Sequence, residues 1–403
     1  MISNRVSKWW AAPRKTTEFI EDRKVSFIEL FYDLAYIAFL SRIGHSFAAN
    51  ISWQGLTSFF LLFIIGWWGW LNGISYHDRH ANDDIRSRVF IFLQMFFVIF
   101  MSIFSHHAIG KDSTYFILSF IGLQCVITYL WWHTGVIDKD YKPISDIYST
   151  VYCISILLLI SSIFMDESIK YFIWLISSLG SLIMALILFD LKTKRDVRFR
   201  HIMEGVTLSE AFLERFSLFT IIVIGEIIFS VVGGVSSSHH FSLQSFYVMV
   251  CCMFIATGIW SLYFDFVAEN LPSDSNSENY VWLYLHVPLK ICITLIGAIL
   301  LHFVEFETYI VDFKYKFLLV SFISMIMIVT GLLNTFSKST SKNRINNKRI
   351  FVVGILTMFL IPLNLNIYML LIMVVFMLYI PHISYLVENV FMTKDESLTL
   401  QGE

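Results

Sequence analysis

The sequence is poor in charge, since Asp, Glu, Lys and Arg make up 15% of its 403 residues, whereas soluble proteins carry about 25%. Hydrophobic residues reach 57% and the mean hydropathy is +0.68, which excludes an ordinary soluble domain and an intrinsically disordered chain. The net charge of −2 provides no concentrated basic face and so excludes a nucleic-acid partner. We therefore predict an integral membrane protein whose main partner is the lipid bilayer.

The signatures of soluble enzymes are missing as well. The sequence contains no GxSxG, no HExxH, no GxxxxGK[ST] loop and no GxGxxG turn after a strand. Its five cysteines all lie in apolar stretches and lack CxxC spacing, so we interpret them as small core residues. We expect no cofactor and no bound metal. The sequence leaves open whether the protein is an enzyme, and it favours a protein that is not one.

Apolar runs of helix length fill most of the chain. A helix needs about 20 apolar residues to cross a hydrocarbon core of about 30 Å, and lipid admits only helices or closed barrels. The pattern predicts an all-α fold with about twelve transmembrane helices, at 25–45, 56–75, 89–108, 114–132, 145–165, 170–189, 208–232, 244–265, 281–303, 317–336, 350–363 and 367–388. The run at 350–363 is short and is followed by Asn364 and Asn366, so it predicts either a short helix or a re-entrant turn.

Lys and Arg accumulate in alternate loops. With the N-terminus inside, the cytoplasmic segments hold 22 of the 29 basic residues and the outer loops hold four. Because basic residues collect in cytoplasmic loops, we expect both termini in the cytoplasm. The predicted organisation is a tail at 1–24, a six-helix half at 25–190, a basic linker at 191–207, a second six-helix half at 208–388 and a tail at 389–403.

Two short motifs recur at nearly equal offsets. Residues 27–31 (FIELF) resemble residues 212–216 (FLERF) 185 positions later, and residues 76–78 (YHD) resemble residues 263–265 (YFD) at an offset of 187. Each pair lies in spans of matching rank and direction, which predicts two parallel six-helix repeats of the kind that transporters use. Coincidence among aromatic-rich helices is the alternative.

Ionisable side chains inside the predicted spans are the main functional candidates. Glu29, Asp33 and Tyr36 are spaced i, i+4, i+7, which places them on one helix face. Charges inside a membrane are costly and by default mark functional sites, although a structural set of ion pairs is the alternative. The expected transport pathway or intramembrane charge cluster comprises Glu29, Asp33, Tyr36, Glu214, Arg215, Glu226, His286 and Lys290.

A second polar group lies at the cytoplasmic end of the second span. In a helix, His77, His80 and Asp84 would share a face and could hold zinc with an open position. Arginines interleave with the acidic residues, so we favour a solvated turn with local ion pairs over a metal site. This cytoplasmic-end polar patch comprises His77, Asp78, His80, Asp83, Asp84 and Asp265.

The chain resembles the bacterial low temperature requirement protein A family (LtrA). Residues 29–34 (ELFYDL) are similar to that family's Glu-Leu-Phe-Phe-Asp-Leu opening, with Tyr32 where Phe is usual. The similarity continues through Asp83-Asp84, through 214–226 and through 260–289, and it covers residues 25 to about 300. The resemblance implies a protein of the bacterial cytoplasmic membrane linked by name to growth in the cold. It implies no established reaction, cofactor or catalytic residue.

These observations together predict a proton- or cation-coupled transporter of unknown substrate. Two alternatives stay open. The first is a membrane-embedded enzyme that acts on a lipid or lipid-linked substrate at the cytoplasmic-end polar patch. The second is a structural or sensory membrane protein for growth in the cold. The sequence does not identify which ion or small molecule is the substrate. It does not indicate the oligomeric state either.

Overall fold

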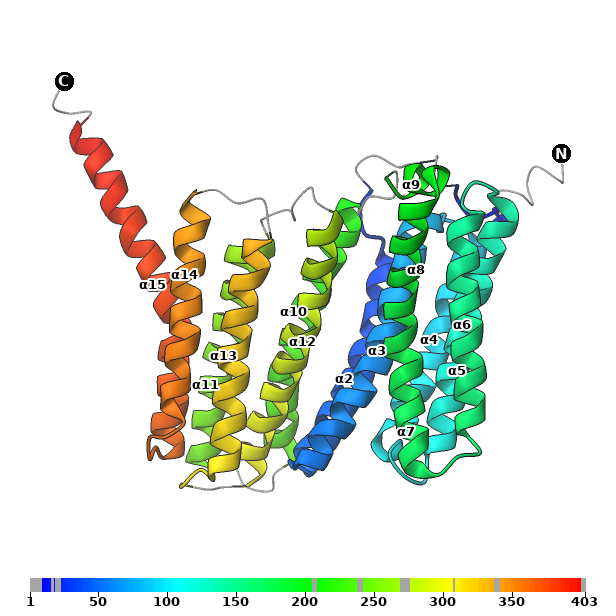
Figure 1. Cartoon of the computed structure of the whole chain (residues 1–403). Helices are drawn as coiled ribbons and strands as arrows, with labels where there is room; N and C mark the ends of the chain where they lie inside the picture. Colours follow the sequence, from blue (N-terminus) through cyan, green and yellow to red (C-terminus); the bar gives the residue numbers. More distant parts are fainter. Residues whose placement is uncertain are drawn as a thin grey trace. The chain divides into compact units, whose positions relative to one another are not determined.

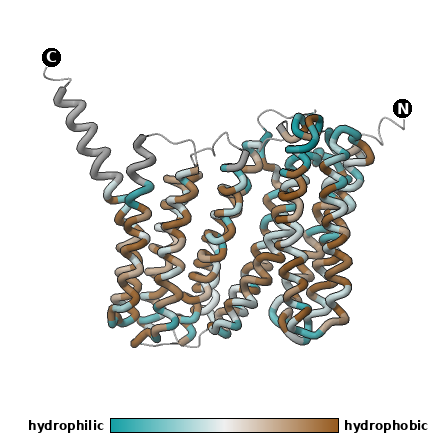
Figure 2. Tube along the Cα trace, viewed as in Figure 1, coloured by the Kyte–Doolittle hydropathy of each residue, from teal (hydrophilic) through white to brown (hydrophobic). Residues whose placement is uncertain are grey.

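The computed structural model describes residues 9–15, 18, 23–204, 209–237, 242–268, 276–306, 309–336 and 341–399. Within these ranges the chain is helical and contains no strand, apart from one antiparallel bridge between Ile310 and Asn366 (Figure 1). The long helices are mainly apolar along their shafts, and hydrophilic residues gather near the helix ends (Figure 2). The prediction of an all-α, multi-pass membrane protein is confirmed at this level.

Ten helical segments of the described chain are long and apolar enough to cross a membrane. They are Trp53–His80, Ile85–His107, Ser113–Ile137, Lys142–Ser162, Glu167–Arg195, Glu210–Ser237, Leu243–Ala268, Glu278–Glu305, Phe313–Thr335 and Ile367–Ser384. Each overlaps one of the predicted spans. The two other predicted spans are also helical, but they are more polar: α2 (Phe27–Ala49) carries Glu29 and Asp33, and α14 (Ser341–Thr357) begins with a polar run.

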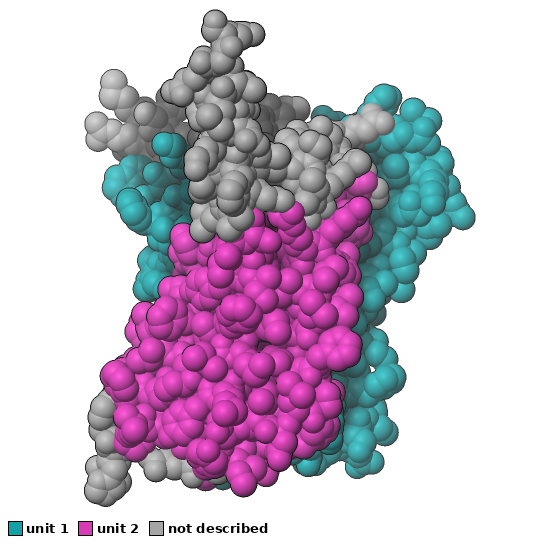
Figure 3. Space-filling view, turned by 90° about the vertical axis from the view of Figure 1, so that its left-hand side faces the viewer, with its two compact units in different colours: residues 1–219 teal, residues 220–403 magenta. Residues whose placement is uncertain are grey.

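The chain divides into two compact units, residues 1–219 (unit 1) and residues 220–403 (unit 2), which Figure 3 distinguishes by colour. The boundary lies inside α10 (Glu210–Ser237). The predicted six-helix halves come from sequence repeats rather than from contacts, and they stay a prediction. The predicted linker at 191–207 contains the end of α8 (Ser181–Arg195) and all of α9 (Val197–Glu204), while 205–208 lie outside the described residues.

Unit 1 is built from antiparallel helices with short connections. They are α2 (Phe27–Ala49), α3 (Trp53–His80), α4 (Ile85–Phe104), α5 (Ser113–Ile137), α6 (Lys142–Ser162), α7 (Glu167–Leu175), α8 (Ser181–Arg195) and α9. A 3₁₀ turn, η1 (Ser105–His107), follows α4, and a π-helical turn, η2 (Ile176–Gly180), joins α7 to α8. The first turns of α2, α4 and α6 lie at the same end of unit 1 as the last turns of α3, α5 and α8 (Figure 1). We call this the Asp84 end, after the residue before α4.

Polar caps fix where the first helices of unit 1 begin. Ser26 precedes α2, and the Glu29 carboxylate accepts from the Ser26 backbone N–H at 2.9 Å, which completes a capping box. Ser52 caps α3 by accepting from the Gly55 N–H at 3.0 Å. Asp84 caps α4, with its Oδ1 3.1 Å from the backbone nitrogen of Ser87. Glu29 therefore has a structural role at the helix start in addition to its charge.

Unit 2 contains the rest of α10 and five further helices. They are α11 (Leu243–Tyr263), which runs into the π-helical turn η3 (Phe264–Ala268), α12 (Asn276–Glu305), α13 (Phe313–Thr335), α14 (Ser341–Thr357) and α15 (Ile367–Thr399). The predicted weak span at 350–363 is part of a longer helix, because α14 begins at Ser341 and continues as the 3₁₀ turn η4 to Leu360. Its apolar part, from Ile350, covers about 16 Å, or roughly half of a hydrocarbon core.

Candidate functional site

Asp33 on α2 and Arg215 on α10 form an ion pair that is shut off from solvent inside unit 1. Both side chains are 0% exposed. Arg215 Nη2 donates to Asp33 Oδ1 at 2.7 Å, and Arg215 Nε donates to Oδ2 at 3.4 Å, so the guanidinium meets the carboxylate side by side. The indole Nε1 of Trp70 on α3 donates to the same Oδ1 at 2.8 Å. Donors on two other helices, α3 and α10, thus contact this carboxylate.

Glu29 extends the ion pair toward the Asp84 end. Arg215 Nη1 lies 3.5 Å from Glu29 Oε1, which also lies 2.5 Å from Arg23 Nη2. The other Arg23 nitrogen, Nη1, lies 2.8 Å from Asp78 Oδ1, and the Ser209 hydroxyl donates to that oxygen at 2.5 Å. The ionic groups joined in this way are Arg23, Glu29, Asp33, Asp78 and Arg215, which we call the α2 charge network.

A chain of uncharged polar groups runs beside the α2 charge network. The hydroxyls of Tyr32 and Tyr36 lie 3.1 Å apart, and Tyr32 donates to Gln94 Oε1 at 3.2 Å. Gln94 Nε2 in turn lies 3.0 Å from His77 Nε2. Because the amide nitrogen can only donate, His77 Nε2 accepts and the ring proton lies on Nδ1. We call Tyr36, Tyr32, Gln94 and His77, all of them buried, the polar ladder.

Glycines on α3 allow α2 to lie against it. A Cβ atom added to Gly69 would lie 2.7 Å from Leu123 Cδ2 and 2.9 Å from the Tyr36 hydroxyl. A Cβ atom at Gly73 would overlap the Tyr32 hydroxyl. Small residues at helix contacts let backbones approach closely. Gly69 and Gly73, one turn apart on α3, therefore leave room for the two tyrosines of the polar ladder.

The two acidic residues between α3 and α4 have different environments. Asp84 is buried, and besides capping α4 it accepts from the Ala11 backbone N–H at 2.8 Å. Asp83 is 90% exposed and lies 2.7 Å from an Arg88 guanidinium nitrogen. Exposed pairs of this kind contribute about 1 kcal/mol or less. Asp84 thus anchors the segment before α2, whereas Asp83 faces solvent.

The histidines of the cytoplasmic-end polar patch do not converge on a shared centre. His80 Nδ1 lies 2.9 Å from the Arg14 carbonyl, and His77 contacts Gln94 in the polar ladder. Arg14 also reaches the end of α3, where its Nε donates to the Arg79 carbonyl at 3.1 Å. Burial lowers the pKa of Arg14, although a guanidinium stays charged at physiological pH. Among the described residues no three His, Cys, Asp or Glu side chains are grouped to bind a metal.

Glu214 and Asp265 lie apart from these networks on exposed positions. Glu214 is next to Arg215 in sequence, but its side chain is exposed, since adjacent residues of a helix point in different directions. Asp265, in η3 of unit 2, is 46% exposed and lies 3.5 Å from His382 Nε2. The Ser261 hydroxyl also donates to it. Sequence analysis grouped Asp265 with the α3 patch, but the partners given for it are in unit 2.

The remaining candidates are buried in unit 2. Lys290 Nζ donates to the Thr220 hydroxyl at 2.9 Å, and Lys290 is 0% exposed. His286, one turn earlier on α12, has its Nδ1 2.9 Å from the Trp282 carbonyl and its Nε2 2.9 Å from the Tyr263 hydroxyl. Because a carbonyl oxygen only accepts, the Nδ1 atom carries a proton and donates to Trp282, while the Tyr263 hydroxyl can donate to Nε2 or accept from it. Glu226 accepts from its helix neighbour Ser230 at 3.0 Å.

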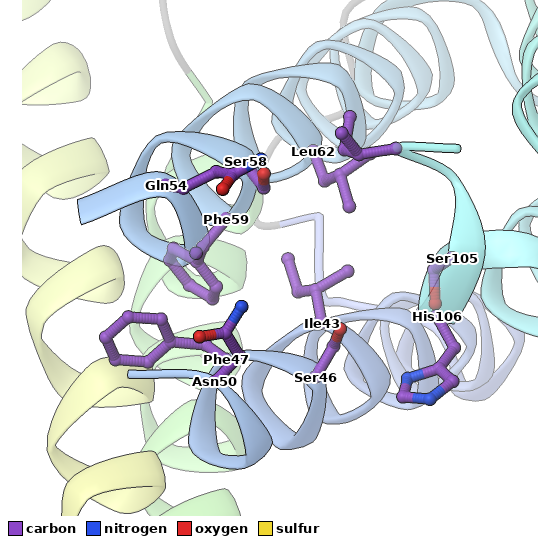
Figure 4. Close-up of a pocket in the computed structure, with 12 residues that line it drawn as sticks. Ile43, Ser46, Phe47, Asn50, Gln54, Ser58, Phe59, Leu62, Ser105 and His106 are labelled. Carbon is purple, nitrogen blue, oxygen red and sulfur yellow. The ribbon is translucent and has the colours of Figure 1, made fainter. Parts of the chain in front are cut away.

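An open polar cavity lies at the end of unit 1 opposite the Asp84 end. It has a volume of about 210 Å³ and is formed by α2, α3 and η1 (Figure 4). Its polar lining consists of Ser46, Asn50, Gln54, Ser58, Ser105 and His106. Deeper along α2, the Phe39 ring occupies the space beside Gly66, is 0% exposed and stacks on Phe116. Along α2, Phe39 therefore lies between Ile43 of the cavity lining and Tyr36 of the polar ladder.

Sequence reasoning missed several members of these networks. Arg23 lies in the predicted tail, where a basic residue is ordinary, and yet it contacts two buried carboxylates. Trp70 is one of 11 tryptophans and has no distinguishing sequence signal. Gln94 is an uncharged polar residue in the apolar run of α4, and a search extended from charges to buried amides would have found it.

Comparison with known proteins places these residues in a family. A Rhizobium meliloti (strain 1021) protein described as uncharacterized is 23% identical over 294 residues, which cover 68% of each chain. No solved structure matches the chain. The family model described as bacterial low temperature requirement A protein (LtrA) matches residues 24–383, a range that includes the polar ladder and every member of the α2 charge network except Arg23. The chain therefore belongs to the bacterial low temperature requirement A (LtrA) protein family.

Proposed function

We propose that the protein is a proton- or cation-coupled transporter in the bacterial plasma membrane, with a substrate still to be identified. In this proposal α2 and α14 complete a set of twelve spans, arranged as two parallel six-helix repeats. Both termini and the Asp84 end lie in the cytoplasm, in agreement with the distribution of Lys and Arg. The equal offsets of the two repeated motifs support the repeat.

The observation that carries the transport proposal is the Asp33–Arg215 pair. Both groups are 0% exposed, and Asp33 lies about 12 Å along the helix from the start of the predicted first span, well inside the hydrocarbon region. Keeping charge there is costly, and such residues commonly belong to ion or proton pathways. An acyl-chain-facing helix would place apolar side chains at this position instead.

The pair suggests how coupling works. A proton or a small cation that binds the Asp33 carboxylate competes with the Arg215 guanidinium for the same oxygens. Once Asp33 is neutralised, Arg215 loses its main partner and is left with Glu29 at 3.5 Å. The ion pair thus has two alternative states, which is what a coupled transporter needs in order to link ion binding to a change of conformation.

The polar cavity at the opposite end of α2 is the entry site in this proposal. Its amide and hydroxyl side chains suit a small polar solute or a hydrated ion. Phe39 lies one turn deeper along α2 than Ile43, which lines the cavity, and it is buried, so in this proposal its ring has to move for an ion to pass from the cavity to Asp33. The structure would then correspond to a state in which the inner part of the pathway is closed.

Charge movement across a membrane tests the proposal. Purified protein is reconstituted in proteoliposomes on a solid-supported membrane, and currents are recorded after pH jumps, cation jumps and additions of pooled metabolites. We expect a transient current that Glu29→Gln/Asp33→Asn abolishes. The matched control is Asp146→Asn/Asp190→Asn, which removes two exposed carboxylates that pair with lysines and should keep the current. Equal currents from all three proteins, at equal protein level, would contradict the assignment.

A structural role for the α2 charge network is the second candidate, because the structure gives each of its carboxylates a cationic partner. The exchange Asp33→Arg/Arg215→Asp separates the two functions. If the pair only holds helices together, the exchanged protein keeps its stability and its activity. If Asp33 on α2 binds the coupling ion, the exchanged protein folds but carries no current.

A further inference from the structure

A second cavity lies at the Asp84 end of unit 1. Its volume is about 250 Å³, and it is bounded by the segment before α2, the first turn of α2, the α3–α4 connection and the first turns of α4. Four basic side chains line it, namely Arg14, Arg23, Lys24 and Arg88, against the two acidic residues Glu29 and Asp83. The cavity is therefore positively charged and suits an anion.

Two of the basic side chains have unused capacity for an anion. Arg14 is 8% exposed, and its Nε and Nη2 donate to the carbonyls of Arg79 and Asp78 at the end of α3. Its third nitrogen, Nη1, is buried and has no hydrogen-bond partner among the described residues. Lys24 is exposed and has no ion pair within the same residues. Guanidinium and ammonium groups in this arrangement favour phosphate oxygens.

An apolar surface of α2 and α4 lies beside the cavity. Ile28 and Ile91 line it on that side. Phe31 on α2 and Phe92 on α4 are 51% and 49% exposed, and their ring centroids lie 6.4 Å apart. The surface continues along α4 through side chains that are 46–56% exposed, namely Phe96, Ile99 and Ile103. In a membrane protein, such outward-facing apolar side chains meet acyl chains.

We propose that this cavity binds the phosphate of an anionic phospholipid, whose acyl chains lie along the exposed faces of α2 and α4. The cavity is smaller than a typical site for a drug-sized molecule, so it fits a headgroup and leaves the chains outside. Basic residues at the cytoplasmic surface attract anionic lipids, and the same end is cytoplasmic by the distribution of Lys and Arg. This proposal goes beyond transport and does not depend on it.

Lipid binding at this site bears directly on the α2 charge network. Arg23 lines the cavity and also holds Glu29 and Asp78. A phosphate that forms an ion pair with Arg23 competes with Glu29 and Asp78 for the guanidinium and so weakens those two contacts. The lipid is therefore expected to act on the network at the start of α2.

Native mass spectrometry of the full-length protein in neutral detergent tests the site. The probes are phosphatidylglycerol, phosphatidylcholine with the same acyl chains, and inorganic phosphate. The test variant is Lys24→Gln/Arg88→Gln, which changes exposed side chains and spares Arg14, whose removal would disturb the end of α3. The matched control is Lys139→Gln/Arg195→Gln, which removes two exposed charges outside the cavity.

We expect the protein to prefer phosphatidylglycerol and the test variant to bind it roughly 30-fold more weakly, since each basic side chain near an anionic surface contributes about a factor of five. The control pair should change the affinity less than twofold. Phe31→Ser/Phe92→Ser should weaken phosphatidylglycerol binding without changing any response to inorganic phosphate. Equal binding of both lipids, an equal loss in the control pair, or inorganic phosphate binding as tightly as the lipid would each overturn the proposal.

Discussion

Removing one partner of the Asp33–Arg215 pair should destabilise the protein strongly, and removing both should not. Arg215→Gln removes the cation beside Asp33, whose side chain is 0% exposed. The Trp70 indole nitrogen, 2.8 Å from Asp33 Oδ1, stays as a donor to the carboxylate. Two unit charges about 4 Å apart at an effective dielectric constant of about 20 interact by about 4 kcal/mol. Breaking a buried pair on one side typically costs about 3–5 kcal/mol, because the other charge stays buried without compensation.

The assay is a double-mutant cycle on purified protein, with Tm measured for the wild type, Asp33→Asn, Arg215→Gln and the double variant. For a unit of this size, each 1 kcal/mol shifts Tm by about 2–4 °C, so Arg215→Gln should lower Tm by roughly 6–20 °C. The double variant should recover most of that loss, because two uncharged amides remain where one unpaired charge would be. A Tm within about 2 °C of the wild type for Arg215→Gln, or a double variant with the sum of both losses, would refute this reasoning.

Two further substitutions test packing and hydrogen bonding around the same helix. Gly69→Ala should lower the free energy of unfolding by about 1–3 kcal/mol, because its methyl group would lie 2.7 Å from a Leu123 methyl. Gly225→Ala places no atom within 4 Å of the new carbon and should be neutral or slightly stabilising in denaturant or thermal unfolding. Equal losses of stability in the two variants would argue against close packing at Gly69. Trp70→Phe removes the indole donor to Asp33 and should lower the free energy of unfolding by about 1–3 kcal/mol, and an unchanged Tm would show that this hydrogen bond contributes nothing.

The sequence was sufficient to predict the helices and part of the site. Apolar runs correctly indicated where helices occur because a span needs a fixed length of hydrophobic residues. The i, i+4 spacing predicts that Glu29 and Asp33 share one helix face, and in the structure both carboxylates contact Arg215, another member of the predicted cluster. The start of α14 was missed because Ser341 and the following polar residues carry no apolar signal, although the backbone continues as one helix.

What sequence reasoning could not supply was the choice of partner for each polar group. Glu29 and Glu214 hold matching places in the repeated motif, and yet Glu29 is 3% exposed and Glu214 is exposed. Which face of a helix is buried depends on its neighbours, and a short motif does not contain that information. The three candidate zinc ligands do not share one helix, because α3 ends at His80 and Asp84 caps α4, and each of the three contacts a different group.

The polar ladder has a consequence for the movement of protons. Gln94 accepts from Tyr32 through its oxygen and donates to His77 through its nitrogen. A proton that arrived at the oxygen could leave from the nitrogen only if the amide passed through its unstable imidic acid form. The ladder thus links α2, α3 and α4 mechanically but interrupts proton hopping at its centre. Protons that reach His77 cannot pass to the tyrosines by this route, and traffic to Asp33 has to use another one.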